Sequence, residues 1–244
     1  MGVTSGPAPV YLLAGGPGSR RTEGDPLMTR ILASSGVSHP SVAYVGAASG
    51  DNRPFFLMLS TYMRHWGAGQ VTLAPLVSKR AKVEKARAIL ESADMVLMSG
   101  GDVEAGMKVL EERQILPFLR ELYQSGKPFC GISAGSVMLA RQWVRWEDPD
   151  DEATATLFPC MGFAPVLCDM HGEGEGWEEL QALLRLTPEG TLGYGIPAGA
   201  GLCVYPDGRL EALGAPVPCY ARQGGAVAHS GDLPPKVSVG STRP

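Results

Sequence analysis

The sequence is poor in the residues that build disulfide frames, zinc sites and nucleic-acid surfaces. Its five cysteines are an odd number without tight spacing, a pattern typical of reduced thiols. The net charge is −4, and no cluster of lysine and arginine is long enough to follow a phosphate backbone. We therefore expect no nucleic-acid partner, no metal and no other cofactor.

Long apolar runs are also missing. No stretch approaches the roughly 20 residues that cross a bilayer, and the N-terminus lacks a basic region followed by a long apolar run. These absences predict a cytoplasmic protein without a membrane partner. The 244 residues, 44% of them hydrophobic, suit one domain over 1–244, with a core from about 10 to 215 and a mobile tail over 224–244.

Short apolar runs alternate with helical patterns along the first half of the chain. This alternation predicts an α/β fold with a doubly wound, mostly parallel sheet and helices on both faces. Two apolar runs around an Asp-Gly turn, at 202–205 and 210–213, predict a C-terminal β-hairpin. The other predicted strands are 10–14, 41–45, 71–73, 95–98, 129–132 and 162–170, and the predicted helices are 55–66, 82–92, 103–122 and 178–186.

The strand predicted at 129–132 ends in the most informative motif. Residues 131–135 read Gly-Ile-Ser-Ala-Gly between an apolar run and a helix-compatible segment, which is the context of a nucleophile elbow. Such a turn strains the serine backbone and leaves no room for side chains at the glycines. It also aims the Ala134 N–H at an oxyanion formed beside Ser133. The alternative is a tight turn whose serine caps the helix.

A serine nucleophile needs a base, and the chain has four histidines. His171 is the candidate because it follows a predicted strand in a loop with glycines and carboxylates. Its alternative is a solvated loop histidine. His39, His65 and His229 fall in a connecting loop, a predicted helix and the tail.

A second oxyanion donor is expected at the end of the neighbouring strand. Gly100-Gly101-Asp102 offers backbone N–H groups that no side chain shields. Because ligand sites of such sheets form at the carboxyl ends of the strands, we expect these residues and Ser133 to share one crevice.

Four segments together resemble the peptidase E and cyanophycinase family of serine peptidases. They are Ser-Gly-Gly-Asp at 99–102, Gly-Ile-Ser-Ala-Gly-Ser at 131–136, Asp-Met-His at 169–171 and Gly-Tyr-Gly-Ile-Pro at 193–197. Their order and spacing are similar to the family's from about residue 10 to 215. The resemblance implies a fold like that of class I glutamine amidotransferases.

The resemblance also implies roles for individual residues. Ser133 is expected to be the nucleophile, His171 the general base, and the N–H groups of Gly101 and Ala134 the oxyanion hole. The family cleaves small acidic peptides without a metal, so a small peptide or amide substrate is expected. Residues expected beside the substrate are Gly100, Asp102, Asp169, Glu173 and Glu175.

The chain departs from the family pattern at the third member of the triad. The family carries a glutamate where this chain has Ala198. Without an acid the imidazole loses the partner that fixes its tautomer, a change that costs about 10⁴ in turnover in a serine protease. The candidates for a substitute carboxylate are Glu147, Asp148, Glu173 and Glu175.

A second departure concerns specificity. Arginines that hold substrate carboxylates in cyanophycinases are replaced here by glutamates, which favour a basic or amine-bearing substrate. The alternative is that these glutamates form a solvated loop and the start of a helix. They are Glu173, Glu175, Glu178 and Glu179.

Two functions of different classes follow. The first is a serine hydrolase that cleaves a small peptide or amide bond. The second is a catalytically weak or inactive member of the family that binds a small molecule or peptide. An amidotransferase would need cysteine at the elbow, whereas Cys130 lies three residues earlier, inside the strand. The substrate's identity and a homodimer stay open.

Overall fold

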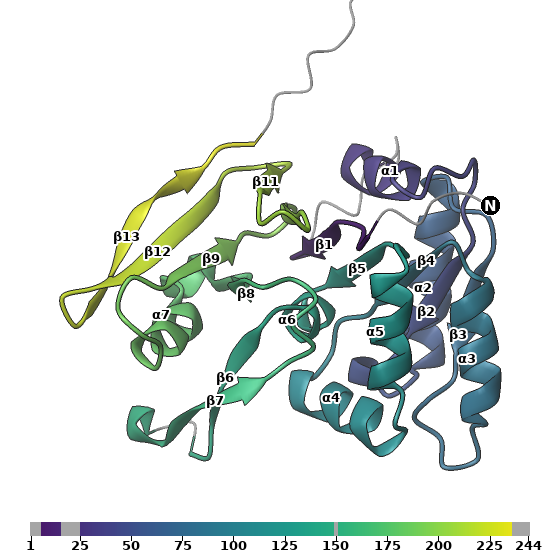
Figure 1. Ribbon diagram of the computed structural model, residues 1–244, viewed down its shortest axis with the longest axis horizontal. Helices are drawn as coiled ribbons and strands as arrows, with labels where there is room; N and C mark the ends of the chain where they lie inside the picture. Colours follow the sequence, from purple (N-terminus) through teal and green to yellow (C-terminus); the bar gives the residue numbers. More distant parts are fainter. Residues whose placement is uncertain (1–5, 16–24, 149–150, 236–244) are drawn as a thin grey trace, which may run out of the picture.

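The computed structural model describes residues 6–15, 25–148 and 151–235, and its centre is a seven-stranded sheet (Figure 1). The strands are β1 (Val10–Leu13), β2 (Val42–Val45), β3 (Val71–Ala74), β4 (Met95–Met98), β5 (Phe129–Ile132), β10 (Gly201–Val204) and β11 (Leu210–Leu213). Their order is β11-β10-β1-β5-β4-β2-β3. Strands β1 to β5 run parallel, and β10 and β11 are antiparallel at one edge. The predicted parallel sheet and C-terminal hairpin are confirmed.

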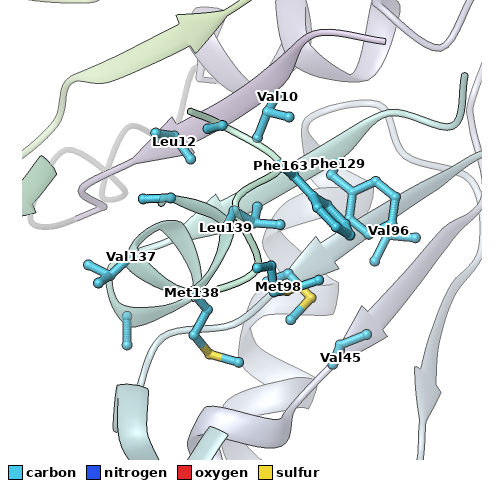
Figure 2. Close-up of a cluster of buried hydrophobic side chains, with 14 of the residues drawn as sticks. Val10, Leu12, Val45, Val96, Met98, Phe129, Val137, Met138, Leu139 and Phe163 are labelled. Carbon is cyan, nitrogen blue, oxygen red and sulfur yellow. The ribbon is translucent and has the colours of Figure 1, made fainter. Parts of the chain in front are cut away.

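Helices cover both faces of this sheet, as its continuous apolar strands require. One face packs against α1 (Pro26–Ala33) and α2 (Arg53–His65). The other face packs against α3 (Val83–Ser92), α4 (Val103–Glu112), α5 (Leu116–Gln124) and α6 (Ala134–Leu139). Figure 2 shows the α6 side chains beside those of the strands in the core on this second face. The doubly wound architecture is therefore confirmed.

A second sheet, which the pattern analysis did not resolve, lies beyond the β1 side of the first (Figure 1). It contains β8 (Leu167–Met170), β9 (Leu192–Ile196), β12 (Val217–Gln223) and β13 (Ala226–Leu233), in the order β13-β12-β9-β8, and α7 (Glu178–Arg185) packs against it. Strands β6 (Gln142–Trp146) and β7 (Ala155–Pro159) pair as a hairpin. Short 3-10 helices are η2 (Ala47–Ser49), η3 (Glu152–Thr154) and η4 (Gly172–Glu175).

Prolines explain two wrong predictions of element length. The helix predicted over 103–122 is two helices, because α4 ends at Glu112 and α5 begins at Leu116 with Pro117 in its first turn. Proline lacks the N–H that a helix interior needs, so it starts a helix more readily than it continues one. The strand predicted over 162–170 is regular only from Leu167, after Pro165.

The tail from Gly224, which was expected to be mobile, contains a regular strand over 226–233. Gly224 and Gly225 both have positive φ, as the central residues of a tight hairpin turn require. Gln223 pairs with Ala226 across that turn, so β13 extends the second sheet. The rest of the predicted tail, 236–244, lies outside the described residues.

All five cysteines are free thiols in the structure, and Cys130 is a buried core residue, as predicted. Within the described ranges, no helix is long and apolar enough to cross a membrane. The same ranges contain no cluster of three or more His, Cys, Asp or Glu side chains arranged to hold a metal ion.

Candidate active site

Ser133 occupies a strained turn between β5 and α6. Its φ of 52° is unusual for a residue with a side chain. The backbone N–H of Ser133 donates to the Leu13 carbonyl at 2.8 Å, which anchors the turn to β1. A Cβ at Gly131 would collide with the Ser136 backbone, and one at Gly135 with the Met98 carbonyl. The glycines of the motif are therefore required by close backbone approach.

The Ser133 hydroxyl does not cap α6. Ser133 is the N-cap residue of this helix, yet its side chain makes no capping hydrogen bond. The hydroxyl instead lines a cavity of about 710 Å³ at the carboxyl ends of the strands. This geometry favours the elbow over the alternative in which the serine serves only as a helix cap.

The cavity brings together residues that are distant in the sequence. Ser133, His171, Gly100 and Gly101 all line it. A Cβ added at Gly100 would lie 3.3 Å from the Ser133 Cβ, so the β4 strand end passes directly beside the serine. The strand ends of β4 and β5 thus share one crevice, as the sequence suggested.

Two backbone N–H groups near Ser133 have no partner in the described part of the chain. They belong to Gly101 and Ala134. Gly101 has a φ of +141°, and a Cβ there would collide with the Ala48 carbonyl. Only glycine therefore fits the backbone conformation that leaves this N–H unpaired beside the serine. Two neighbouring N–H groups that make no hydrogen bond are what an oxyanion hole requires.

His171 follows β8 in a left-handed conformation with a φ of 63°. Its backbone N–H donates to the Ile196 carbonyl at 3.2 Å, which ties it to the end of β9. The side chain is exposed and lines the same cavity as Ser133. Among the described residues neither the His171 ring nor the Ser133 hydroxyl makes a hydrogen bond. Contacts between a nucleophile and its base often tighten only in the substrate complex.

A carboxylate reaches the backbone of Ala198. Glu173 lies two residues after His171 in η4, and its Oε1 accepts a hydrogen bond of 3.0 Å from the Ala198 N–H. The next residue, Gly199, donates to the Gly15 carbonyl at 2.7 Å and lines the cavity. Of the four candidate carboxylates, Glu173 is thus bonded directly to the loop that carries Ala198. All four carboxylates belong to exposed residues.

Several residues expected beside the substrate lie elsewhere. The Asp102 carboxylate accepts from the Ala105 N–H at 2.7 Å and caps α4. Asp169 and Glu173 are absent from the described lining of the cavity, as are Glu175 and the glutamates that begin α7. The cavity instead has a wall that sequence reasoning did not assign to a site. It comes from α1 and α2, whose apolar residues at helical spacing look like ordinary core positions.

Asp169 is buried at the end of β8. Its Oδ1 accepts from the Met170 N–H at 2.6 Å, and Trp177 packs against the adjoining Gly172. Burial, followed by the negative charge of Glu179, raises the pKa of the Asp169 carboxyl to about 7. This carboxyl therefore releases its proton near neutral pH rather than near pH 4.

We expect Asp169→Asn to stabilise the protein above pH 7 and to have little effect below pH 4. At low pH both the folded and unfolded states hold the Asp169 proton, so burial of a charged carboxylate does not lower the free energy of unfolding. As the pH rises from about 4 to 7, only the unfolded state releases it, and folding stability falls. The full loss of folding stability, on the order of 2–4 kcal/mol, is present above pH 7. Urea unfolding at pH 4 and pH 8 measures it; equal effects at both values would contradict this assignment.

The chain is similar in sequence to a known family and to members of it. The family model described as peptidase family S51 matches residues 10–209. A peptidase E of Pasteurella multocida is 34% identical over 129 residues, and one of Haemophilus influenzae is 29% identical over 123. These matches cover 50% and 48% of the chain and 55% and 56% of the relatives. The chain thus spans little more than half the length of either relative.

Solved structures show the same fold. A peptidase from an acI-B1 Actinobacterium superposes with a TM-score of 0.71 at 13% identity, over 95% of this chain and 98% of that one. A putative peptidase E of Listeria monocytogenes gives a TM-score of 0.63 at 15% identity, over 84% and 98%. The family match extends over most of the chain and includes the elbow, the Gly100-Gly101 strand end and His171. The chain therefore belongs to peptidase family S51.

Proposed function

We propose that this protein is a serine peptidase that cleaves a small peptide or amide bond. The observation that carries the proposal is the single cavity shared by the strained Ser133, the exposed His171 and Gly101. The Ser133 hydroxyl attacks the carbonyl carbon, and His171 takes its proton. The oxyanion accepts hydrogen bonds from the Gly101 and Ala134 N–H groups. His171 then returns the proton to the leaving amine, and water releases the acyl group from Ser133.

Glu173 is the proposed support for His171. It starts from the same short segment as the histidine, and its carboxylate is held at Ala198 by the 3.0 Å hydrogen bond. One carboxylate oxygen is engaged there, which leaves the other free to orient an imidazole. A carboxylate in this role stabilises the imidazolium that forms during attack.

We expect Glu173→Gln to lower kcat by about 10²-fold, the lower end of what acid–base catalysis contributes. The amide keeps a hydrogen-bond acceptor for Ala198 but loses the charge that stabilises imidazolium. In the Glu173→Gln background, Ala198→Glu should restore kcat, because it places a carboxylate at the position of the family acid. The readout is kcat against pH for a dipeptide substrate. Glu84→Gln, exposed on α3, is the control; an unchanged kcat in Glu173→Gln would contradict the role.

The reaction with a fluorophosphonate probe tests the whole proposal. Such a probe bonds covalently to an activated serine and leaves unactivated hydroxyl groups unmodified. We expect stoichiometric labelling of Ser133, detected by mass spectrometry, and a much slower reaction in His171→Ala. A wild-type protein that neither reacts with the probe nor hydrolyses dipeptides would contradict the proposal.

The second candidate function is a non-catalytic binding module. The observation that favours it is Ala198, which removes the expected acid from the loop beside the cavity. In that case the cavity binds its ligand without converting it, and Ser133→Ala binds the same ligand with unchanged affinity. Calorimetry on the wild type and this variant, together with the labelling experiment, separates the two functions.

A further inference from the structure

The catalytic cavity extends from Ser133 onto an apolar wall. This wall is built by α1 and α2, the two helices that cover the same face of the central sheet. Its side chains are aromatic or aliphatic and come from one turn of α1 and three turns of α2. They are Leu27, Met28, Phe55, Met58, Leu59, Tyr62 and Trp66.

The aromatic part of the wall is rigid. The rings of Tyr62 and Trp66 are stacked with centroids 5.6 Å apart and an angle of 16° between their planes. Trp66 is only 7% exposed. The Thr29 hydroxyl donates to the Trp66 carbonyl at 3.3 Å, which joins α1 to the end of α2. A preformed wall of this kind loses little conformational freedom when it binds an apolar group.

The described lining of the cavity offers little charge to compensate a charged substrate side chain. No lysine or arginine belongs to the lining that the structure describes. The one carboxylate in that lining, Asp25, accepts from the Leu27 and Met28 N–H groups and caps α1. Among these described residues, a carboxylate transferred from water would find no cation to compensate its lost hydration. An ammonium group would find a single carboxylate in this lining, whose Oδ1 already accepts both N–H groups of the α1 cap.

The size of the cavity matches a small peptide with one bulky side chain. Its volume of about 710 Å³ lies within the roughly 300–1,000 Å³ typical of sites for small molecules. Ser133, His171 and Gly101 line this cavity together with the stacked rings of Tyr62 and Trp66. A peptide whose scissile bond lies at Ser133 thus has an apolar surface available to the adjacent side chain.

We propose that this member of the family acts on peptides with an uncharged aromatic or large aliphatic side chain beside the scissile bond. This inference rests on the proposed hydrolase function and names the substrate class of the same site. It replaces the expectation of an amine-bearing substrate, because the glutamates at 173–179 do not belong to the described lining. Burial of a phenylalanine-sized group accounts for a preference of about 10- to 100-fold in kcat/KM.

Hydrolysis of four dipeptide amides that differ only in the side chain beside the scissile bond tests the preference. We expect the wild type to cleave the Phe and Leu substrates at least about 10-fold faster, in kcat/KM, than the Asp and Lys substrates. Met58→Arg places a cation in the wall at a side chain that is 44% exposed, so the fold tolerates it. This variant should lose the Phe preference and gain about 10-fold on the Asp substrate. Leu57→Arg, on the same helix but absent from the lining, is the matched control and should behave as wild type.

Binding to Ser133→Ala separates this inference from the hydrolase function. Calorimetry should show that this variant binds the Phe dipeptide amide at least about 10-fold more tightly than the Asp one. If the wild type hydrolyses neither but binding shows the same order, the hydrolase function fails and the apolar specificity stands. Preferential cleavage or binding of the Asp or Lys substrate, or equal values for all four, would overturn the specificity and leave the hydrolase function intact. Absence of binding to every dipeptide would overturn it as well.

Discussion

Ser133→Ala should reduce peptide hydrolysis by up to about 10⁶-fold, the loss seen when the serine nucleophile of a catalytic triad is removed. The substitution removes the attacking oxygen and nothing else. The Ser133 hydroxyl makes no hydrogen bond to a described residue, and the N–H that anchors the turn to Leu13 belongs to the backbone. We therefore expect the free energy of unfolding to stay within about 0.5 kcal/mol of wild type.

Ser136→Ala is the matched control for this experiment. Ser136 lies one turn further along α6, and its buried hydroxyl accepts from the Leu13 N–H and donates to the Leu13 carbonyl, both at 2.9 Å. Loss of the hydroxyl removes the acceptor of the buried Leu13 N–H, which costs about 1–3 kcal/mol, whereas the Leu13 carbonyl still accepts from the Ser133 N–H. The control should thus lower stability while probe labelling of Ser133 persists. Undiminished hydrolysis by Ser133→Ala would assign the nucleophile to another residue.

Gly101→Ala should lower kcat by about 10²- to 10³-fold, the effect of losing one oxyanion-hole donor. The added methyl group collides with the Ala48 carbonyl, and the φ of +141° is one that alanine adopts at a considerable cost. The strand end has to shift, and its free N–H moves away from the oxyanion. The Asp102 N–H, which donates to the same Ala48 carbonyl at 2.9 Å, moves with it.

Gly36→Ala separates backbone strain from catalysis. Gly36 has a positive φ of +71°, yet a Cβ there would meet no other atom within 4 Å. Both variants should therefore lose stability in urea unfolding, whereas only Gly101→Ala should lose kcat in the folded protein with KM little changed. Full turnover in folded Gly101→Ala would remove this N–H from the proposed mechanism.

The elements that were predicted well are those with strong local patterns. The strands at 10–13 and 95–98 are short apolar runs closed by glycine, and the elbow combines such a run with a small-residue helix. Each of these signals is complete within a few residues, so packing elsewhere does not alter it. The break at Gln114 and the hairpin turn at 224–225 were also encoded locally, by Pro117 and by a Gly-Gly pair. The wrong prediction for the helix at 103–122 and the strand missed in the tail therefore do not reflect a missing local signal.

The candidate site was predictable only in part. Ser133, His171 and Gly101 were identified because motifs mark them, and the structure places all three on one cavity. The Glu173 contact with Ala198 spans 25 residues and depends on how η4 faces the loop after β9. Sequence reasoning offered Glu173 as one of four carboxylates and had no means of choosing among them.

The sequence by itself determined the doubly wound sheet and the strained turn that carries Ser133. These features follow from patterns within single segments, where backbone geometry and side-chain size act over a few residues. Only the tertiary structure decided what surrounds Ser133. Tyr62 and Trp66 have the spacing of ordinary core residues, and their role depends on how α1 and α2 cover the sheet. Packing between distant segments sets the shape and polarity of the cavity, and the proposal of an apolar substrate rests on that shape and not on the motif.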